Sequence, residues 1–171
     1  ETAQEPDYEN GKGRIVSYSS VPLLDKMRRC LPDVLSEKGN GMIAEGNHYF
    51  DSKTCGIGYH GDSERKRAVA VRVGNTTPLC YQWYKNGNAI GERFMLELHH
   101  GDVYIMSEKA VGTDWKKRTI CTLRHAAGAA KYITVVVHKK QTQKRKAADD
   151  SEQPKSDKRR KIVVVGAAKV I

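Results

Sequence analysis

The sequence predicts a mainly β fold, a sandwich or jelly roll, buttressed by one or two N-terminal helices. Three observations support it. Apolar residues recur at helical spacing between Pro22 and Gly39, about seven short β-favouring segments follow between residues 56 and 137, and turn sequences separate those segments. The 171 residues are enough for one compact core and a tail.

The N-terminal region is expected to be helical after a short disordered start. Residues 1–13 are polar and interrupted by Gly and Pro, which predicts disorder. Ser19 and Ser20 can supply a helix N-cap, and Pro22 suits the first turn. Because Pro32 interrupts the apolar run before Gly39 ends it, we expect either one kinked helix or two short ones.

Short segments rich in β-branched and aromatic residues then alternate with turns. The predicted strands are residues 56–60, 68–74, 79–84, 93–99, 102–108, 118–124 and 132–137. Asn86-Gly87 predicts a tight hairpin between two of them. The small residues 126–130 (AAGAA) are expected to form the turn before the last strand.

Most of the net charge of +10 belongs to the C-terminal segment. Residues 138–171 carry eleven Lys and Arg against four acidic residues, whereas residues 1–137 carry nineteen against sixteen. We therefore predict a β domain over residues 14–137 and a basic disordered tail over 138–171. The clusters at 144–146 (KRK) and 158–161 (KRRK) indicate a nuclear-localisation signal or a nucleic-acid contact, so we expect a nuclear or cytoplasmic location, of which the clusters favour the nuclear one.

The sequence argues against a membrane-spanning protein and against a zinc-knuckle or dithiol redox protein. No apolar run approaches the roughly 18 residues that a membrane span needs. The four cysteines form no CxxC pair, which argues against a zinc knuckle or a dithiol redox motif.

The strongest chemical signal is His60-Gly61-Asp62 at the end of a predicted strand. A His and a carboxylate two residues apart can both reach one metal where a strand bends. Such a pair supplies two ligands of the 2-His-1-carboxylate triad of non-haem iron, which leaves positions open for a co-substrate and oxygen.

Basic residues near the ends of later strands suggest an anionic co-substrate. Arg118 and Arg124 are an even number of residues apart and are expected to share a strand face, and Lys131 precedes the last strand. A cation that faces into a barrel needs an anionic partner. A dicarboxylate such as 2-oxoglutarate would satisfy this requirement.

The order of these motifs resembles the AlkB-type iron(II)- and 2-oxoglutarate-dependent dioxygenases, which fold as a double-stranded β-helix (jelly roll). The resemblance covers about Leu31 to Val137 and includes Asn-x-Tyr at 47–49, His-x-Asp-x-Glu at 60–64 and Gly101-Asp102. It implies that His60 and Asp62 bind iron and that Asn47 and Tyr49 hydrogen-bond 2-oxoglutarate. It also places Glu64 at the substrate mouth.

The third metal ligand has two possible positions, because no His lies between Ser107 and Lys117, where the family has one. In one register, Arg118 and Arg124 bind the diacid and Asp114 replaces the missing His. In the other, which we favour, His125 is the second imidazole ligand and Lys131 binds the distal carboxylate.

The resemblance implies hydroxylation of a substrate C–H bond, with oxygen and 2-oxoglutarate consumed and succinate and carbon dioxide released. For an AlkB-like enzyme the substrate would be a nucleic-acid base whose N-alkyl group is hydroxylated and lost as an aldehyde; a protein side chain is the other option. The alternative from another class is a catalytically inactive jelly-roll module that binds nucleic acid through its basic tail.

Overall fold

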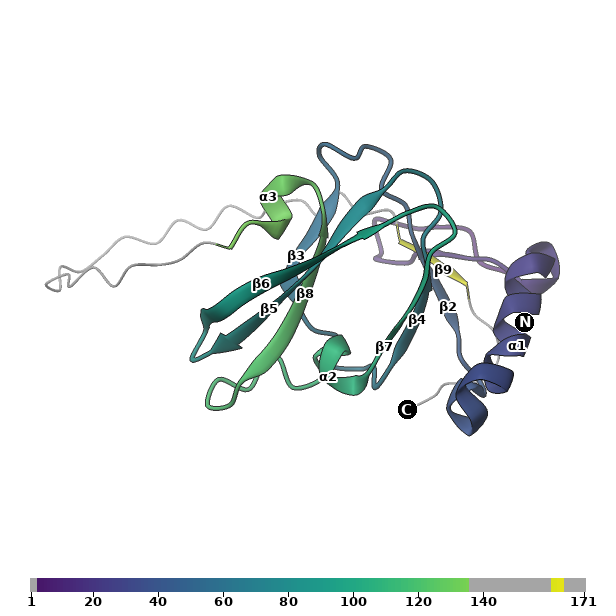
Figure 1. Ribbon diagram of the computed structural model, residues 1–171. Coiled ribbons are helices and arrows are strands. Elements are labelled where there is room, and N and C mark those ends of the chain that lie inside the picture. The colour runs from purple at the N-terminus through teal and green to yellow at the C-terminus, as the bar shows by residue number, and fades with distance from the viewer. Residues whose placement is uncertain (1–2, 136–160, 165–171) are drawn as a thin grey trace, which may run out of the picture. The chain divides into compact units, whose positions relative to one another are not determined.

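The computed structural model describes residues 3–135 and the backbone of residues 161–164 (Figure 1). The described residues form two units, one up to His48 together with residues 161–164, and one from Tyr49 onward. The domain predicted over residues 14–137 therefore contributes to both units. Among the described residues, no helix is long and apolar enough to cross a membrane.

The predicted N-terminal helix is confirmed as α1, Pro22–Leu35, with Pro22 at its first turn and Pro32 inside it. It lies between two short 3-10 helices, η1 (Tyr18–Ser20) and η2 (Ser36–Gly39). The predicted N-cap was wrong. Ser17 caps η1 by accepting from the backbone N–H of Ser19, and Val21 precedes α1 with no side-chain cap.

The remaining strands of the first unit correct the two predictions of disorder. Strand β9 (Lys161–Val164) lies between β1 (Arg14–Ile15), to which it is parallel, and β2 (Ala44–Asn47), to which it is antiparallel. Disorder was therefore wrong for these four residues of the tail. The rest of the tail, including both basic clusters up to residue 160, lies outside the described residues.

The N-terminal start is also ordered. Gln4 exchanges two backbone hydrogen bonds with Ile15, at 3.0 and 2.9 Å, and Asp7 pairs with Lys12. The chain therefore folds back on itself over residues 4–15. The polar residues that predicted disorder here form a hairpin-like turn, in which backbone groups hydrogen-bond to each other.

The second unit contains two antiparallel sheets whose strands pair as nested hairpins. Its strands are β3 (Gly56–His60), β4 (Ala68–Val71), β5 (Thr77–Lys85), β6 (Asn88–Leu98), β7 (Val103–Met106) and β8 (Thr122–Gly128). Strands β5 and β6 form the inner pair, β4 and β7 the next, and β3 and β8 the outer one. Strand β8 also pairs with β5, which gives a sheet of order β3-β8-β5-β6 beside the pair β4-β7 (Figure 1).

A mainly β fold with N-terminal helical segments is thus confirmed, and the first five strands predicted in this unit are present. The hairpin at Asn86-Gly87 is confirmed as well, since both residues have positive φ (52° and 80°), as a two-residue type I′ turn requires.

The core of this unit lies between the two sheets. Leu79 of β5, Leu98 of β6 and Met106 of β7 pack together with Val111 of the short helix α2 (Glu108–Val111). Because Leu79 and Met106 come from different sheets, this cluster holds the sheets face to face. It also defines an inner face for each strand, which is the face that carries the site described below.

The end of the unit differs from the prediction. Strand β8 begins at Thr122 and includes Ala126 to Gly128, which we expected to form a turn, and the predicted strand from Tyr132 starts as helix α3, Ala130–Ile133. A Cβ on Gly128, whose φ is +99°, would lie 2.5 Å from the Cys55 carbonyl oxygen and 2.5 Å from the Gly56 Cα. The small residues therefore let β8 approach β3 closely.

We expect Gly128→Ala to destabilise the protein by about 3 kcal/mol or more, because the methyl group meets backbone that cannot move aside. Gly74→Ala is the matched control, since Gly74 also has positive φ (+91°) but faces open space. It should cost only about 1–2 kcal/mol for the unfavourable backbone conformation. Urea unfolding measures both, and equal costs would show that the β3–β8 approach is not tight.

Candidate metal centre

Strand register places His60, His125, Tyr81 and Phe94 in one row across the four-stranded sheet. His60 of β3 is opposite His125 of β8, His125 is opposite Tyr81 of β5, and Tyr81 is opposite Phe94 of β6. The neighbouring row contains the core residue Leu79 opposite Ala127. Because side chains two residues apart share a face, the row of His125 and Tyr81 lies on the inner face.

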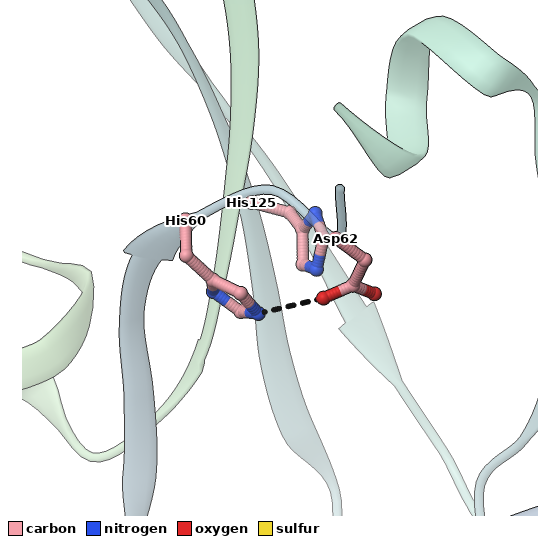
Figure 2. Close-up of side chains that lie close together, drawn as sticks. All are labelled: His60, Asp62 and His125. Atoms are coloured by element: carbon pink, nitrogen blue, oxygen red, sulfur yellow. Dashed lines mark ion pairs between the residues drawn. The ribbon is translucent and has the colours of Figure 1, made fainter. Parts of the chain in front are cut away.

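The two imidazoles and the Asp62 carboxylate converge at one end of this row (Figure 2). The ring centroids of His60 and His125 are 4.4 Å apart, and Nε2 of His60 is 3.4 Å from Oδ1 of Asp62. One potential ligand atom from each residue lies within 4.8 Å of the other two. His125 is buried, and the side chains of His60 and Asp62 are 22% and 17% exposed.

Hydrogen bonding orients the His60 ring. Its Nδ1 lies 2.8 Å from the carbonyl oxygen of Gly58. Since a carbonyl only accepts, Nδ1 carries the proton and donates, which leaves the Nε2 lone pair directed toward Asp62. A metal-binding histidine is usually held in this way by its other ring nitrogen.

Burial keeps His125 ready to coordinate. Desolvation, with a smaller contribution from the nearby His60, lowers the pKa of His125 to about 4, so its imidazole is neutral at pH 7. Its buried Nδ1 has no hydrogen-bond partner among the described residues.

Burial and the neighbouring side chains have opposite effects on the pKa of the Asp62 carboxyl. Burial acts to raise its pKa, but its neighbours, first the His60 side chain and then the charge of Arg65, outweigh it, so the pKa lies below its usual value. Nη1 of Arg65 is 3.3 Å from Oδ2 of Asp62. The site therefore offers an ionised carboxylate from Asp62, a neutral imidazole from His125 and the ring of His60.

These three residues fit a divalent transition metal. Ligand atoms about 2.1 Å from a shared ion lie within roughly 4 Å of one another, so a small rotation of one side chain closes the group. Two imidazoles and a carboxylate on one side of an ion leave its other coordination positions open.

His125, and not Asp114, lies with His60 and Asp62 in the structure. Oδ2 of Asp114 is 2.7 Å from Nζ of Lys109, and that lysine also donates to the Cys121 carbonyl oxygen at 2.8 Å. Asp114 thus binds a lysine in the loop after α2, while His125 stands beside His60.

The predicted cations are not brought together. Arg118 is exposed in the loop before β8, where its carbonyl oxygen accepts from Asn86, so the expected shared face with Arg124 was wrong. Arg124 lies on the outer face of β8, because it is adjacent to His125, and its guanidinium stacks 4.2 Å from the Tyr84 ring. Lys131 is exposed in α3, 5.0 Å from the Tyr132 ring.

The other predicted site residues fall on both units. Glu64 is exposed in the turn just after Asp62. Tyr49 begins the second unit and is half-buried, close enough to Tyr104 to help raise the pKa of that phenol. Asn47 ends β2 in the first unit.

Sequence reasoning missed the inner-face phenols of Tyr81 and Tyr104 as site residues. Burial and the neighbouring Tyr104 raise the pKa of Tyr81 to about 12, and the Tyr81 ring centroid is 6.2 Å from that of His125. The sequence alternation placed Tyr81 on one face of its strand, but only the pairing of β5 with β8 shows that His125 is on that face too.

The chain is similar to a viral protein. It is 50% identical over 130 residues to an uncharacterized protein of Acanthamoeba polyphaga mimivirus, a match that covers 76% of this chain and 51% of the viral protein. The chain thus spans about half the length of that relative. No family model and no solved structure matches the chain.

We expect His125→Ala to weaken Co(II) binding at least about a hundredfold, because two ligands remain of three. His99→Ala is the control. Nδ1 of His99 is 3.6 Å from Oδ2 of Asp102, so it belongs to another His–Asp pair, but both side chains are well exposed. Titration followed by cobalt absorption measures the affinities, with Asp114→Ala included. If Asp114→Ala loses Co(II) binding while His125→Ala keeps it, the third metal ligand is Asp114 and not His125.

Proposed function

We propose that this chain is the catalytic domain of an iron(II)- and 2-oxoglutarate-dependent dioxygenase. The observation that carries the proposal is the group formed by His60, Asp62 and His125, with its imidazoles on paired strands and its carboxylate just after one of them. This is the ligand set and the open geometry of non-haem iron oxygenases.

The strand pairing supports a double-stranded β-helix, or jelly roll, for the second unit. A jelly roll results when one long antiparallel hairpin is rolled up, so that strands equally distant from its tip pair with each other. The pairs β5–β6, β4–β7 and β3–β8 have this nested order, and β5–β8 joins the inner pair to the outer one. In this reading the three ligands lie at one end of the roll.

With iron(II) and 2-oxoglutarate bound, the centre would supply the oxidation of a substrate C–H bond by dioxygen, while 2-oxoglutarate loses carbon dioxide and becomes succinate. The chain itself contributes ligand geometry and surroundings. The imidazoles of His60 and His125 and the ionised carboxylate of Asp62 would hold the metal from one side. The partly buried phenols of Tyr81 and Tyr104 would limit the access of water to the inner face beside it.

Side chains outside the metal group would orient 2-oxoglutarate. We assign a hydrogen bond to Tyr49 and the distal carboxylate to Lys131. Lys131 is chosen because, in the motif order of the resemblance, it stands where the family has the basic residue of its last strand. Helix α3, which carries Lys131, packs on β3 and β8.

The proposed substrate is a nucleic-acid base. Phe94 is 59% exposed in the row of His125, and Trp83 is 39% exposed one step along β5, so flat apolar surface continues from the centre along the inner face. Exposed rings of this kind can stack on an extruded base. Glu64 would contact the base at the mouth, and the basic tail would add affinity for phosphate and direct the protein to the nucleus.

The decisive experiment uses the full chain purified without oxygen. Addition of iron(II) and 2-oxoglutarate should produce the weak visible charge-transfer band of the ternary complex, and oxygen should then yield succinate. His60→Ala and Asp62→Ala should lose both signals, whereas His99→Ala should keep them. Succinate formation that persists in His60→Ala would disprove the assignment, and a metal-loaded protein without band or succinate would indicate an inactive module.

Lys131→Met should raise the KM for 2-oxoglutarate about tenfold to a hundredfold, because a charge-assisted hydrogen bond contributes about 1.5–3 kcal/mol. The affinity for metal alone should not change. Arg118→Met, which removes an exposed cation elsewhere on the unit, should leave the KM unchanged. Steady-state succinate assays measure both, and the opposite pattern would assign the diacid to Arg118.

A further inference from the structure

We propose that the segment Val111–Trp115, here called the strap, positions the metal ligands, and that Arg124 acts on the centre through it. This inference rests on the proposed metal centre and adds positioning residues to it. The strap begins at the last residue of α2 and contacts both ligand-bearing parts of the chain, the loop Gly61–Ser63 and strand β8.

The strap holds the loop that carries Asp62. The backbone N–H of Asp62 donates to the Val111 carbonyl oxygen at 3.0 Å. A Cβ on Gly61 would meet the Gly112 carbonyl oxygen and would lie 2.7 Å from the Trp115 Cβ. The loop therefore contacts the strap directly at both Gly61 and Asp62, and there is no room for a side chain at residue 61.

The strap also contacts the strand that carries His125. Gly112 has φ +77°, and a Cβ there would lie 2.6 Å from the carbonyl oxygen of Leu123 and 3.1 Å from the Gly61 Cα. Leu123 precedes His125 by two residues, and Gly61 precedes Asp62 by one. Gly112 therefore lies between the Gly61–Ser63 loop and strand β8. Because it has no side chain, these two segments can come close enough for Asp62 and His125 to share one metal.

Trp115 and Arg124 complete the connection on the outer side of the sheet. Nε1 of Trp115 donates to Oγ of Ser63 at 3.0 Å, next to Asp62. Nη2 of Arg124 donates to the Trp115 carbonyl oxygen at 3.5 Å, and its guanidinium lies 5.3 Å from the Trp115 ring and 4.2 Å from that of Tyr84. Arg124 thus links the strand of His125 to the loop of Asp62 by way of Trp115.

The end of the strap is tied down as well. Lys109 bonds both Asp114 and the Cys121 carbonyl oxygen, which joins α2, the strap and the approach to β8. Asp114, considered above as a metal ligand, has a structural partner in this tie. The strap is therefore fixed by contacts that do not involve the metal ligands, as a positioning element must be.

The test separates metal geometry from stability. Trp115→Phe keeps the aromatic ring but removes the Nε1 donor, Ser63→Ala removes its acceptor, and Ser63→Thr restores a hydroxyl. Thr113→Val is the matched control, since this strap hydroxyl donates to the Glu108 carbonyl oxygen at 3.2 Å and not to the metal loop. Each full-length variant is titrated with Co(II), and the melting temperature of its metal-free form is recorded.

Loss of one hydrogen bond should weaken Co(II) binding about threefold to tenfold in Trp115→Phe and in Ser63→Ala. The double variant should be no weaker than either single one, because both remove the same bond. Ser63→Thr and Thr113→Val should bind as the wild type does. The melting temperatures of the metal-free forms should stay within a few degrees of one another.

Wild-type affinity in both single variants would overturn the role of the strap while leaving the metal centre intact. The role is overturned in the same way if Co(II) affinity falls only in proportion to melting temperature and falls equally in Thr113→Val, because the strap would then be merely structural. A wild-type protein that binds no Co(II) would instead refute the metal centre, and the strap's role with it.

Discussion

The site depends on the antiparallel pairing of β3 with β8, which sets His60 opposite His125 inside a folded sheet. Backbone hydrogen bonds between these strands hold two imidazoles that are 65 positions apart in the chain at a centroid distance of 4.4 Å. Burial at this place keeps His125 neutral, and Asp62 follows directly because the chain turns away just beyond His60. A change in this register by one residue would send one imidazole to the outer face.

Close approach of backbone to backbone makes this pairing possible. Gly56 and Gly128 face each other where a Cβ would collide with the opposite strand, and Gly61 and Gly112 lie equally close to neighbouring backbone beside the proposed metal ligands. These glycines cost conformational entropy on folding, which the fold offsets with packing elsewhere. Ligand positions defined by backbone contacts are less free to move than those on an exposed loop, which suits a site whose function requires preorganised geometry.

The two faces of the four-stranded sheet separate the chemistry from its support. The inner face carries His60, His125 and the phenol of Tyr81, next to the apolar core. The outer face carries Arg124 between Tyr84 and Trp115. Adjacent residues of β8 thus have different tasks under the proposed function: one imidazole would bind metal, and the neighbouring guanidinium would brace the loop of the carboxylate.

Local patterns in the sequence determined the helix that begins at Pro22, the hairpin at Asn86-Gly87, the first five strands of the second unit and the His60-Asp62 pair, because each depends on residues a few positions apart. The tertiary structure decided the rest. Whether His125 or Asp114 joins that pair, which way Arg124 faces, and that residues 130–133 form a helix depend on strand pairings between distant segments and on close contacts such as Gly128 with Cys55. Propensity and periodicity do not encode such contacts, since they arise only when separate strands meet.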